Sequence, residues 1–381
     1  MPVLPEYVYL HYPLCRHTCS YCDFNVYTAS KYEGFSDIWL KGIERDLTTF
    51  SGGEASSSGP AQAKLRSLYL GGGTPSLLEP KEIERLVGII EKFYSARSSD
   101  FEFTIECNPE SLTEQKLRDF KKLGINRVSL GIQSFSEIEL KRLERLSTRA
   151  HLLNALEWTS KYFKNFTVDL MLGIPDQIKN QLDQNLSEAL EFNPPHLSLY
   201  LLTIANDHLW KTNSFMKKHL NSDESAREFY LASTYLLESK GYEHYEVSNF
   251  SKPGFRSRHN SNYWNIKSSY LGLGPGAHGY LPSTSRRRYE MIRDPQEWSR
   301  DETGVSWTED LSVEQTRLEE FYFKLRTRQP ICLTESPDVL KALVNDAVLQ
   351  PTENDHYILS DNGWLLIESV AARLLQCAKN I

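Results

Sequence analysis

Short apolar runs alternate with segments of helical periodicity along the first two hundred residues of the chain. The apolar runs predict strands at residues 7–12, 65–72, 101–107, 126–133, 166–172 and 196–202. Between them, residues 80–94 and 113–124 place apolar side chains at helical spacing, whereas residues 51–64 show no period and predict a surface loop. A sustained strand–helix alternation indicates parallel strands joined by crossover helices, and therefore an α/β fold.

The pattern becomes less regular beyond residue 205. A helix is expected near 223–240, and residues 270–281 form a turn-rich stretch. The last eighty residues change character again, because 311–326 reads as an amphipathic helix. Residues 357–375 predict a short strand, a turn at Asn362-Gly363 and a helix. We therefore expect a small, helical, winged-helix-like domain at the C-terminal end.

Composition narrows the classes of protein. The chain has 381 residues and a formal net charge of −7, so a dominant nucleic-acid surface is not expected. No apolar run approaches the ~20 residues that a membrane-spanning helix needs, and the first residues lack the basic segment of a signal peptide. The sequence therefore favours a cytoplasmic protein whose thiols stay reduced.

Three of the six cysteines cluster in the stretch LCRHTCSYCDF. Cys15, Cys19 and Cys22 have the spacing Cys-x₃-Cys-x₂-Cys, and the other cysteines are isolated in the sequence. A structural zinc site usually takes four side-chain ligands, so a zinc-stabilised α/β protein is the weaker alternative. Three thiolates can hold three irons of a 4Fe-4S cubane and leave the fourth open, so we favour an iron–sulfur cluster.

Polar or glycine-rich motifs follow the next predicted strands. In LYLGGGTPS (68–76), the predicted strand ends in three glycines, which let the backbone lie against a ligand. TIECNPE (104–110) contains Glu106, whose carboxylate could bind a ribose diol. Gln133 and Asp169 follow the two strands after that. The carboxyl ends of parallel strands share one edge of a sheet, so these groups are expected to face one cavity.

The cysteine spacing, with Tyr21 before the last cysteine, resembles the radical S-adenosylmethionine (SAM) superfamily. That resemblance implies a (β/α)₆ partial TIM barrel in which SAM binds the open iron of the cluster. Nearly the whole chain is similar to the group of oxygen-independent coproporphyrinogen III oxidases (HemN), including its C-terminal domain. By position in those motifs, the resemblance implies SAM contacts from Tyr9, Tyr21, Gly72, Gly73, Thr74, Glu106, Gln133, Arg145 and Asp169.

Two departures from the oxidases point to the related heme chaperones of the HemW type. The oxidases carry a further cysteine where this chain has Phe24, and they carry an N-terminal extension where only fourteen residues precede Cys15. The chaperone motif HNxxYW matches His259, Asn260, Tyr263 and Trp264. His259 would ligate the heme iron, and the rings of Tyr263 and Trp264 would offer flat apolar contact to the porphyrin.

The resemblance implies a heme chaperone that binds a 4Fe-4S cluster, SAM and heme, and that passes heme to an acceptor protein. A membrane respiratory complex is one acceptor that family analogy suggests, which would place the cytoplasmic protein at the membrane periphery. Coproporphyrinogen III oxidation is the alternative, so enzymatic activity stays open. We expect a radical SAM core at 1–205, barrel completion with the heme motif at 206–302, and the C-terminal helical domain at 303–381.

Overall fold

The computed structural model describes residues 4–52, 64–203, 218–265, 267–281, 286–333 and 337–377. The chain groups into two compact units that interleave along the sequence. The first consists of Met1–Leu170, Ser187–Pro195 and Ser269–Asp310, and the second of Met171–Leu186, His196–Ser268 and Leu311–Ile381. The division at residues 205 and 302 therefore stays a prediction, and the first of these boundaries lies outside the described residues.

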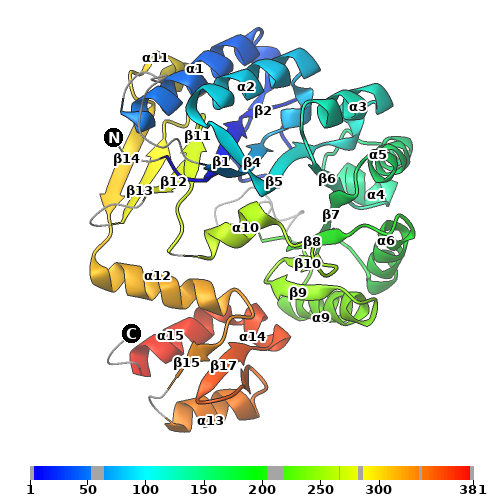
Figure 1. Cartoon of the computed structure of the whole chain (residues 1–381). Coiled ribbons are helices and arrows are strands. Elements are labelled where there is room, and N and C mark those ends of the chain that lie inside the picture. The colour runs from blue at the N-terminus through cyan, green and yellow to red at the C-terminus, as the bar shows by residue number, and fades with distance from the viewer. Residues whose placement is uncertain are drawn as a thin grey trace. The chain divides into compact units, whose positions relative to one another are not determined.

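Parallel strands form the centre of the first unit (Figure 1). They run in the order β11-β1-β4-β5-β6-β7, and each neighbouring pair is parallel. Their bounds are β1 (Tyr7–Tyr12), β4 (Lys64–Gly72), β5 (Ala96–Cys107), β6 (Arg127–Gln133), β7 (Asn165–Leu172) and β11 (Leu271–Leu273). Apart from the polar, mostly exposed start of β5 (ARSSD), the strands are apolar and buried along most of their length, which is typical of a parallel sheet covered on both faces. The predicted α/β fold is confirmed.

Helices follow the strands as the alternation predicts. They are α1 (Phe35–Ser51), α2 (Pro80–Phe93), α3 (Glu114–Lys122), α4 (Glu137–Arg142), α5 (Arg149–Tyr162) and α11 (Pro295–Arg300). Helix α2 shows why this sequence forms a helix here. Glu79 and Glu82 make a capping box and Pro80 opens the first turn, while Ile83, Leu86 and Ile90 bury one face. Figure 1 shows α1, α2, α3 and α5 along the outside of the strands.

The turn-rich stretch at 270–281 contains more regular structure than predicted. It supplies β11 and β12 (His278–Leu281), and β12 joins β13 (Arg287–Met291) and β14 (Val305–Asp310) in an antiparallel sheet. The glycines make this possible. A Cβ at Gly272 would lie 1.8 Å from the carbonyl oxygen of His278, and one at Gly279 would lie 2.1 Å from the ring of Tyr289. They are therefore needed for close packing between strands as well as for turns.

Within the described residues, strands and helices of the second unit precede its C-terminal part, and α6 (Lys179–Glu191) begins in this unit and ends in the first. The strands β8 (His196–Leu201), β10 (Asn249–Ser251) and β9 (Glu243–Glu246) are joined in that order by antiparallel pairs. The helices are α6, α9 (Asp223–Ser239) and α10 (Arg258–Tyr263). The predicted strand at 196–202 and the predicted helix near 223–240 are both present. Ser222 caps α9 by accepting a hydrogen bond from the amide of Ser225.

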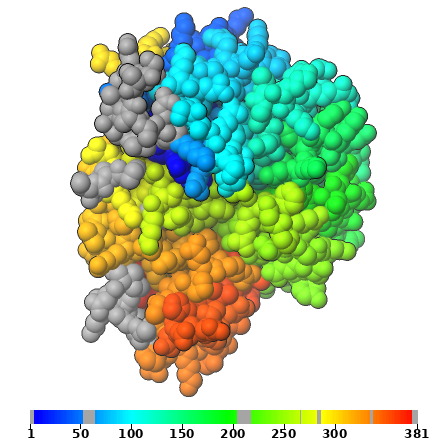
Figure 2. All heavy atoms as spheres, in the orientation of Figure 1, coloured from blue at the N-terminus to red at the C-terminus, as the bar shows by residue number. Residues whose placement is uncertain are grey.

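The C-terminal part of the second unit is helical around a small sheet. Its elements are α12 (Val313–Leu325), β15 (Ile331–Cys332), α13 (Pro337–Asn345), β16 (Leu349–Pro351), β17 (His356–Leu359), α14 (Asp361–Leu365) and α15 (Ile367–Cys377), with strand order β15-β17-β16. Leu325, Leu343 and Trp364 belong to its buried core. This part forms one continuous region of the surface, orange to red in Figure 2.

The turn predicted at Asn362-Gly363 is wrong, because both residues lie inside α14. Ser360 caps this helix: its hydroxyl accepts from the Gly363 amide at 3.0 Å and donates to the carbonyl of Ala347 at 2.6 Å. The cap overrides the turn preference of Asn-Gly. Among the described residues, no helix combines the length and apolar composition that crossing a bilayer requires.

Candidate functional site

The three clustered cysteines lie on a loop that starts directly after β1. Cys15 ends the two-residue strand β2 (Leu14–Cys15), which pairs with β3 (Tyr27–Thr28) and closes the loop. All three thiols are free, with Cys15 buried and Cys19 and Cys22 half-buried. Burial raises the pKa of Cys15 to about 11. Three unpaired thiols on one short loop are a donor set that suits an iron–sulfur cluster.

The end of β4 is built to lie against this loop. The amide of Gly73 donates to the carbonyl of Tyr12 at 2.8 Å, and the amide of Thr74 donates to the carbonyl of Leu14 at 2.8 Å. A Cβ at Gly73 would lie 2.8 Å from the Leu14 oxygen and 2.9 Å from Cys15 Sγ. Any larger residue at this position would therefore displace the loop that carries the first thiol.

A chain of hydrogen bonds links the cysteine loop to the ends of three strands. Thr74 Oγ1 donates to Cys15 Sγ at 3.3 Å, and Asn108 Nδ2 donates to Thr74 Oγ1 at 2.9 Å. Arg145 donates to Asn108 Oδ1 at 2.7 Å and to the carbonyl of Gly131 at 3.0 Å. Asn108 was not among the predicted site residues, although it follows β5 in the TIECNPE motif that contains Glu106.

Arg145 also connects to the other half of the cysteine loop. Its guanidinium lies near Cys19 and Tyr21, and its positive charge lowers the pKa of both groups against the rise that burial causes. Burial raises the pKa of Tyr21 to about 12, and the positive charge of Arg145 opposes that rise. The structure thus brings Arg145, whose assignment rested only on its spacing after Gln133, next to the cysteines.

Glu106 is a buried carboxyl group at the end of β5. Its Oε1 accepts from the Tyr69 hydroxyl at 2.8 Å, and its Oε2 accepts from the Gly72 amide at 3.1 Å. Burial raises its pKa from 4.5 to about 7, and the charge of Asp169 acts in the same direction. Tyr9 lies close by, because a Cβ at Gly71 would approach the rings of Tyr9 and Tyr69 as well as Glu106.

Gln133, at the end of β6, has a left-handed backbone conformation that residues other than glycine rarely adopt. Its φ is 64°, and the register between β6 and β7 shifts between Gly131 and Gln133. Its buried Oε1 has no hydrogen-bond partner among the described residues. Strained backbone and an unsatisfied buried acceptor both favour a position that binds a ligand. The side chains predicted to bind SAM therefore gather in one region of the first unit.

The HNxxYW residues belong to the second unit, where they form α10 and its C-cap. Ser257 caps the helix, and Trp264 is the C-cap residue. His259 is 1% exposed, and its Nε2 lies 2.8 Å from the Tyr263 hydroxyl. The two rings meet edge to face, with their centroids 5.0 Å apart. The imidazole expected to ligate iron is thus buried and already hydrogen-bonded.

Trp264 has a packing role that the sequence did not indicate. Its indole N–H donates to the carboxylate of Glu246, which is 3% exposed, and its ring lies edge-on to Phe323 with centroids 5.8 Å apart. Arg326 stacks over the same ring at 5.3 Å. These contacts fasten the end of α10 to α12.

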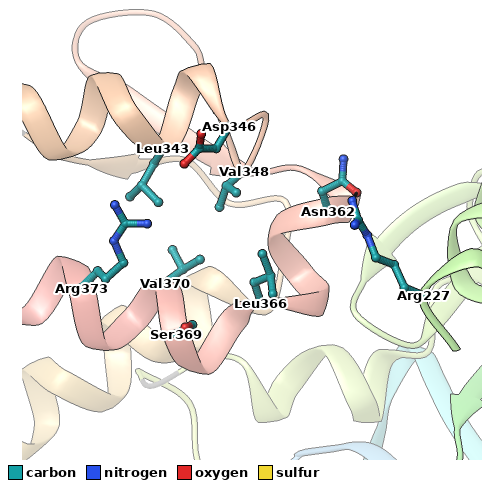
Figure 3. Close-up of a pocket in the computed structure, with 9 residues that line it drawn as sticks. All are labelled: Arg227, Leu343, Asp346, Val348, Asn362, Leu366, Ser369, Val370 and Arg373. Atoms are coloured by element: carbon teal, nitrogen blue, oxygen red, sulfur yellow. Dashed lines mark hydrogen bonds between the residues drawn. The ribbon is translucent and has the colours of Figure 1, made fainter. Parts of the chain in front are cut away.

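A separate pocket of about 320 Å³ lies in the second unit (Figure 3). Leu343, Val348 and Val370 give it a buried apolar floor. Arg227 and Arg373 stand at its rim, and Arg227 donates to Asn362 Oδ1 at 2.9 Å. None of the predicted site residues lines it, and the sequence analysis did not single it out.

Comparison with known proteins agrees with this arrangement. Residues 9–189 match the sequence model of the Radical SAM superfamily. The solved structure of coproporphyrinogen III oxidase (HemN) from Escherichia coli superimposes with a TM-score of 0.81 at 18% identity, covering 98% of this chain and 91% of that one. The chain therefore has the fold of HemN and, over residues 9–189, the sequence pattern of the Radical SAM superfamily.

Sequence relatives are more specific about the family. The heme chaperone HemW of Escherichia coli is 31% identical over 384 residues, which cover 96% of this chain and 97% of the relative. The heme chaperone HemW of Lactococcus lactis is also 31% identical, over 97% of both chains. The chain belongs to the HemW heme-chaperone family, as the sequence resemblance indicated.

Proposed function

We propose that this protein is a heme chaperone that binds heme through His259 and transfers it to an acceptor protein. The observation that carries the proposal is the 31% identity to HemW of Escherichia coli over nearly the full length of both chains. At the level of residues, His259 supports it because a neutral imidazole is a good axial ligand for heme iron. The likeness to the oxidase HemN concerns the fold and does not support oxidase activity.

The same proposal includes a 4Fe-4S cluster on Cys15, Cys19 and Cys22. The three cysteines suit such a cluster, because Gly73 leaves room beside Cys15 Sγ and Arg145 places a positive charge next to Cys19. When bound, such a cluster supplies an open iron position and a single-electron donor. Thr74 and Arg145 would orient the thiolates that hold it.

We propose that SAM binds beside the cysteine loop, through polar side chains and backbone groups at the ends of the strands. Gln133 offers its buried Oε1, and Glu106 offers a carboxyl group with a pKa of about 7 for a ribose diol. Gly72, with a φ of 112°, gives a close approach to the backbone. Tyr9 and Asp169 would complete the walls of this site.

The ligand assignment is tested by heme titration of the purified chain. We expect His259→Ala to lose the Soret band of the imidazole-ligated complex and at least about tenfold in heme affinity. His196→Ala is the matched control, because His196 is also buried and its Nε2 also lies 2.8 Å from a tyrosine hydroxyl, that of Tyr245. Heme binding that is unchanged in His259→Ala, or lost equally in both variants, would contradict the assignment.

The acceptor and the location follow from the same proposal. A protein that carries three cluster-binding thiols needs a reducing compartment, so we propose a cytoplasmic location. An apo-protein that needs heme would take it from α10, and a membrane respiratory complex is the acceptor that family analogy suggests. Anaerobic transfer of heme to a candidate apo-protein, followed by separation of the two proteins, would identify it.

A further inference from the structure

Tyr263 occupies the atom through which His259 would bind iron. His259 Nε2 lies 2.8 Å from the Tyr263 hydroxyl, four residues further along α10. Whichever tautomer the imidazole adopts, the Nε2 lone pair or its proton is engaged in this hydrogen bond. Iron ligation through Nε2 needs an unprotonated and unoccupied lone pair, so it requires that the bond be broken.

The ring of Tyr263 also packs edge to face against the imidazole. The two rings meet at 89° with centroids 5.0 Å apart, and His259 is 1% exposed although Tyr263 itself is half-buried. A porphyrin is far wider than an imidazole, so it cannot approach a side chain this deeply buried. The half-exposed tyrosine is the group whose displacement would open the site.

The rest of the helix is fixed at both ends. At its start, the Ser257 amide donates to the Tyr245 hydroxyl at 3.3 Å, and the Ser257 hydroxyl accepts from the Asn260 amide at 3.3 Å. At its end, Trp264 is held by Glu246 and by the ring of Phe323. Rotation of one side chain is therefore a smaller change than displacement of α10.

We propose that Tyr263 is a gating residue that closes the heme site in the heme-free protein by binding His259 Nε2. This inference rests on the proposed function, since it takes His259 as the ligand. Heme must displace the hydroxyl, so the apparent affinity is reduced by the fraction of molecules in which Tyr263 is bonded. The same hydroxyl is ready to rebind Nε2 when iron leaves, which favours release of heme to an acceptor.

The test is ferric heme titration of the full chain in the wild type, Tyr263→Phe and the double variant Tyr263→Phe/His259→Ala. One hydrogen bond between neutral groups corresponds to roughly 2- to 12-fold in an equilibrium constant. We therefore expect Tyr263→Phe to bind heme roughly 2- to 12-fold more tightly, with the wild-type Soret maximum. Tyr230→Phe is the control, since the Tyr230 hydroxyl lies 3.3 Å from His244 Nε2, outside α10.

The outcomes separate the gate from the ligand. A gain in Tyr263→Phe that disappears in the double variant supports the gate. Unchanged or weaker binding in Tyr263→Phe, with binding lost in His259→Ala, overturns the gate and leaves the ligand standing. A gain that persists without His259 overturns the gate as well, and unchanged binding in His259→Ala alone overturns the proposed ligand. Should Tyr263→Phe fail to fold, the nitrogen NMR shifts of the His259 imidazole in the wild type without heme test the bond instead: shifts typical of a hydrogen-bonded Nε2 are expected, and those of an unbonded Nε2 would overturn the gate.

Discussion

Gly73→Ala should prevent the cysteine loop from holding a cluster while leaving most of the fold intact. The added Cβ would lie 2.8 Å from the Leu14 oxygen and 2.9 Å from Cys15 Sγ. Non-bonded heavy atoms need roughly 3.5 Å or more, so the thiol would have to move by about 0.6 Å. Metal sites tolerate deviations of only about 0.2 Å in ligand distance. Iron loading at Cys15 should therefore fail.

The magnitudes follow from the same contacts. Overpacking at a buried position costs about 1–3 kcal/mol, which is the expected loss in the free energy of unfolding of Gly73→Ala without a cluster. Loss of a residue that only hydrogen-bonds a metal ligand weakens metal binding about tenfold or more. Displacing Cys15, a ligand itself, should weaken cluster binding at least as much. Anaerobic reconstitution followed by iron and acid-labile sulfide analysis measures loading, and urea unfolding of the apo-protein measures stability.

Two other glycines serve as controls. Gly88 lies on α2 with open space around it, so Gly88→Ala should load normally and gain about 0.5–1 kcal/mol in stability. A Cβ at Gly42 would lie 2.1 Å from the ring of Trp298, so Gly42→Ala should be destabilised but should still load its folded fraction. Wild-type iron content and stability in Gly73→Ala would refute the reasoning.

Three further changes test other parts of the structure. Folding raises the pKa of Glu106 from 4.5 to about 7, so the unfolding free energy of the apo-protein should fall by about 3 kcal/mol as the pH rises through that range. Urea unfolding at several pH values measures this fall, and Glu106→Gln should not show it. Trp264→Phe removes the indole donor to the buried Glu246 carboxylate, to which Asn249 still donates, and should cost about 1.5–3 kcal/mol by urea unfolding, whereas Trp307→Phe, at a side chain 46% exposed, should stay within about 0.5 kcal/mol. Ser360→Ala removes the cap of α14 and should lower the melting midpoint by an amount equivalent to about 0.5–2 kcal/mol, which a change below 0.3 kcal/mol would contradict.

The strands and helices that could be predicted are those that the hydrophobic pattern alone determines. A strand buried on both faces needs a continuous apolar run, and a covering helix needs an apolar stripe, so 7–12 and 80–94 were placed to within a residue or so. Strand β11 could not be found this way. It is three residues long and depends on Gly272, which has no Cβ and so lets the carbonyl of His278, six residues further along the chain, pack against it.

Some residues of the site could be predicted from their own strand, whereas others depend on contacts with distant parts of the chain. Strand-end groups such as Glu106 could be predicted because parallel strands end at one edge of a sheet. Asn108 lies only two residues further on, yet its role depends on Thr74 and Arg145, which approach from other strands. The strained backbone of Gln133 has no signature in the sequence either, because it arises from a register shift between β6 and β7.

The match to the heme motif identified residues 259–264 but did not predict the contacts that these side chains make. The spacing of His259 and Tyr263, four residues apart, puts both on one face of any helix, so their contact was implicit in the sequence. The motif match favoured contact of both aromatic rings with a porphyrin over a packed tyrosine–tryptophan pair beside a structural histidine. In the structure, the hydroxyl of Tyr263 lies 2.8 Å from the imidazole Nε2, and Trp264 contacts Glu246 and Phe323. A buried imidazole gains from any available hydrogen-bond partner, and so the same residues that suit heme also bind one another until heme displaces them.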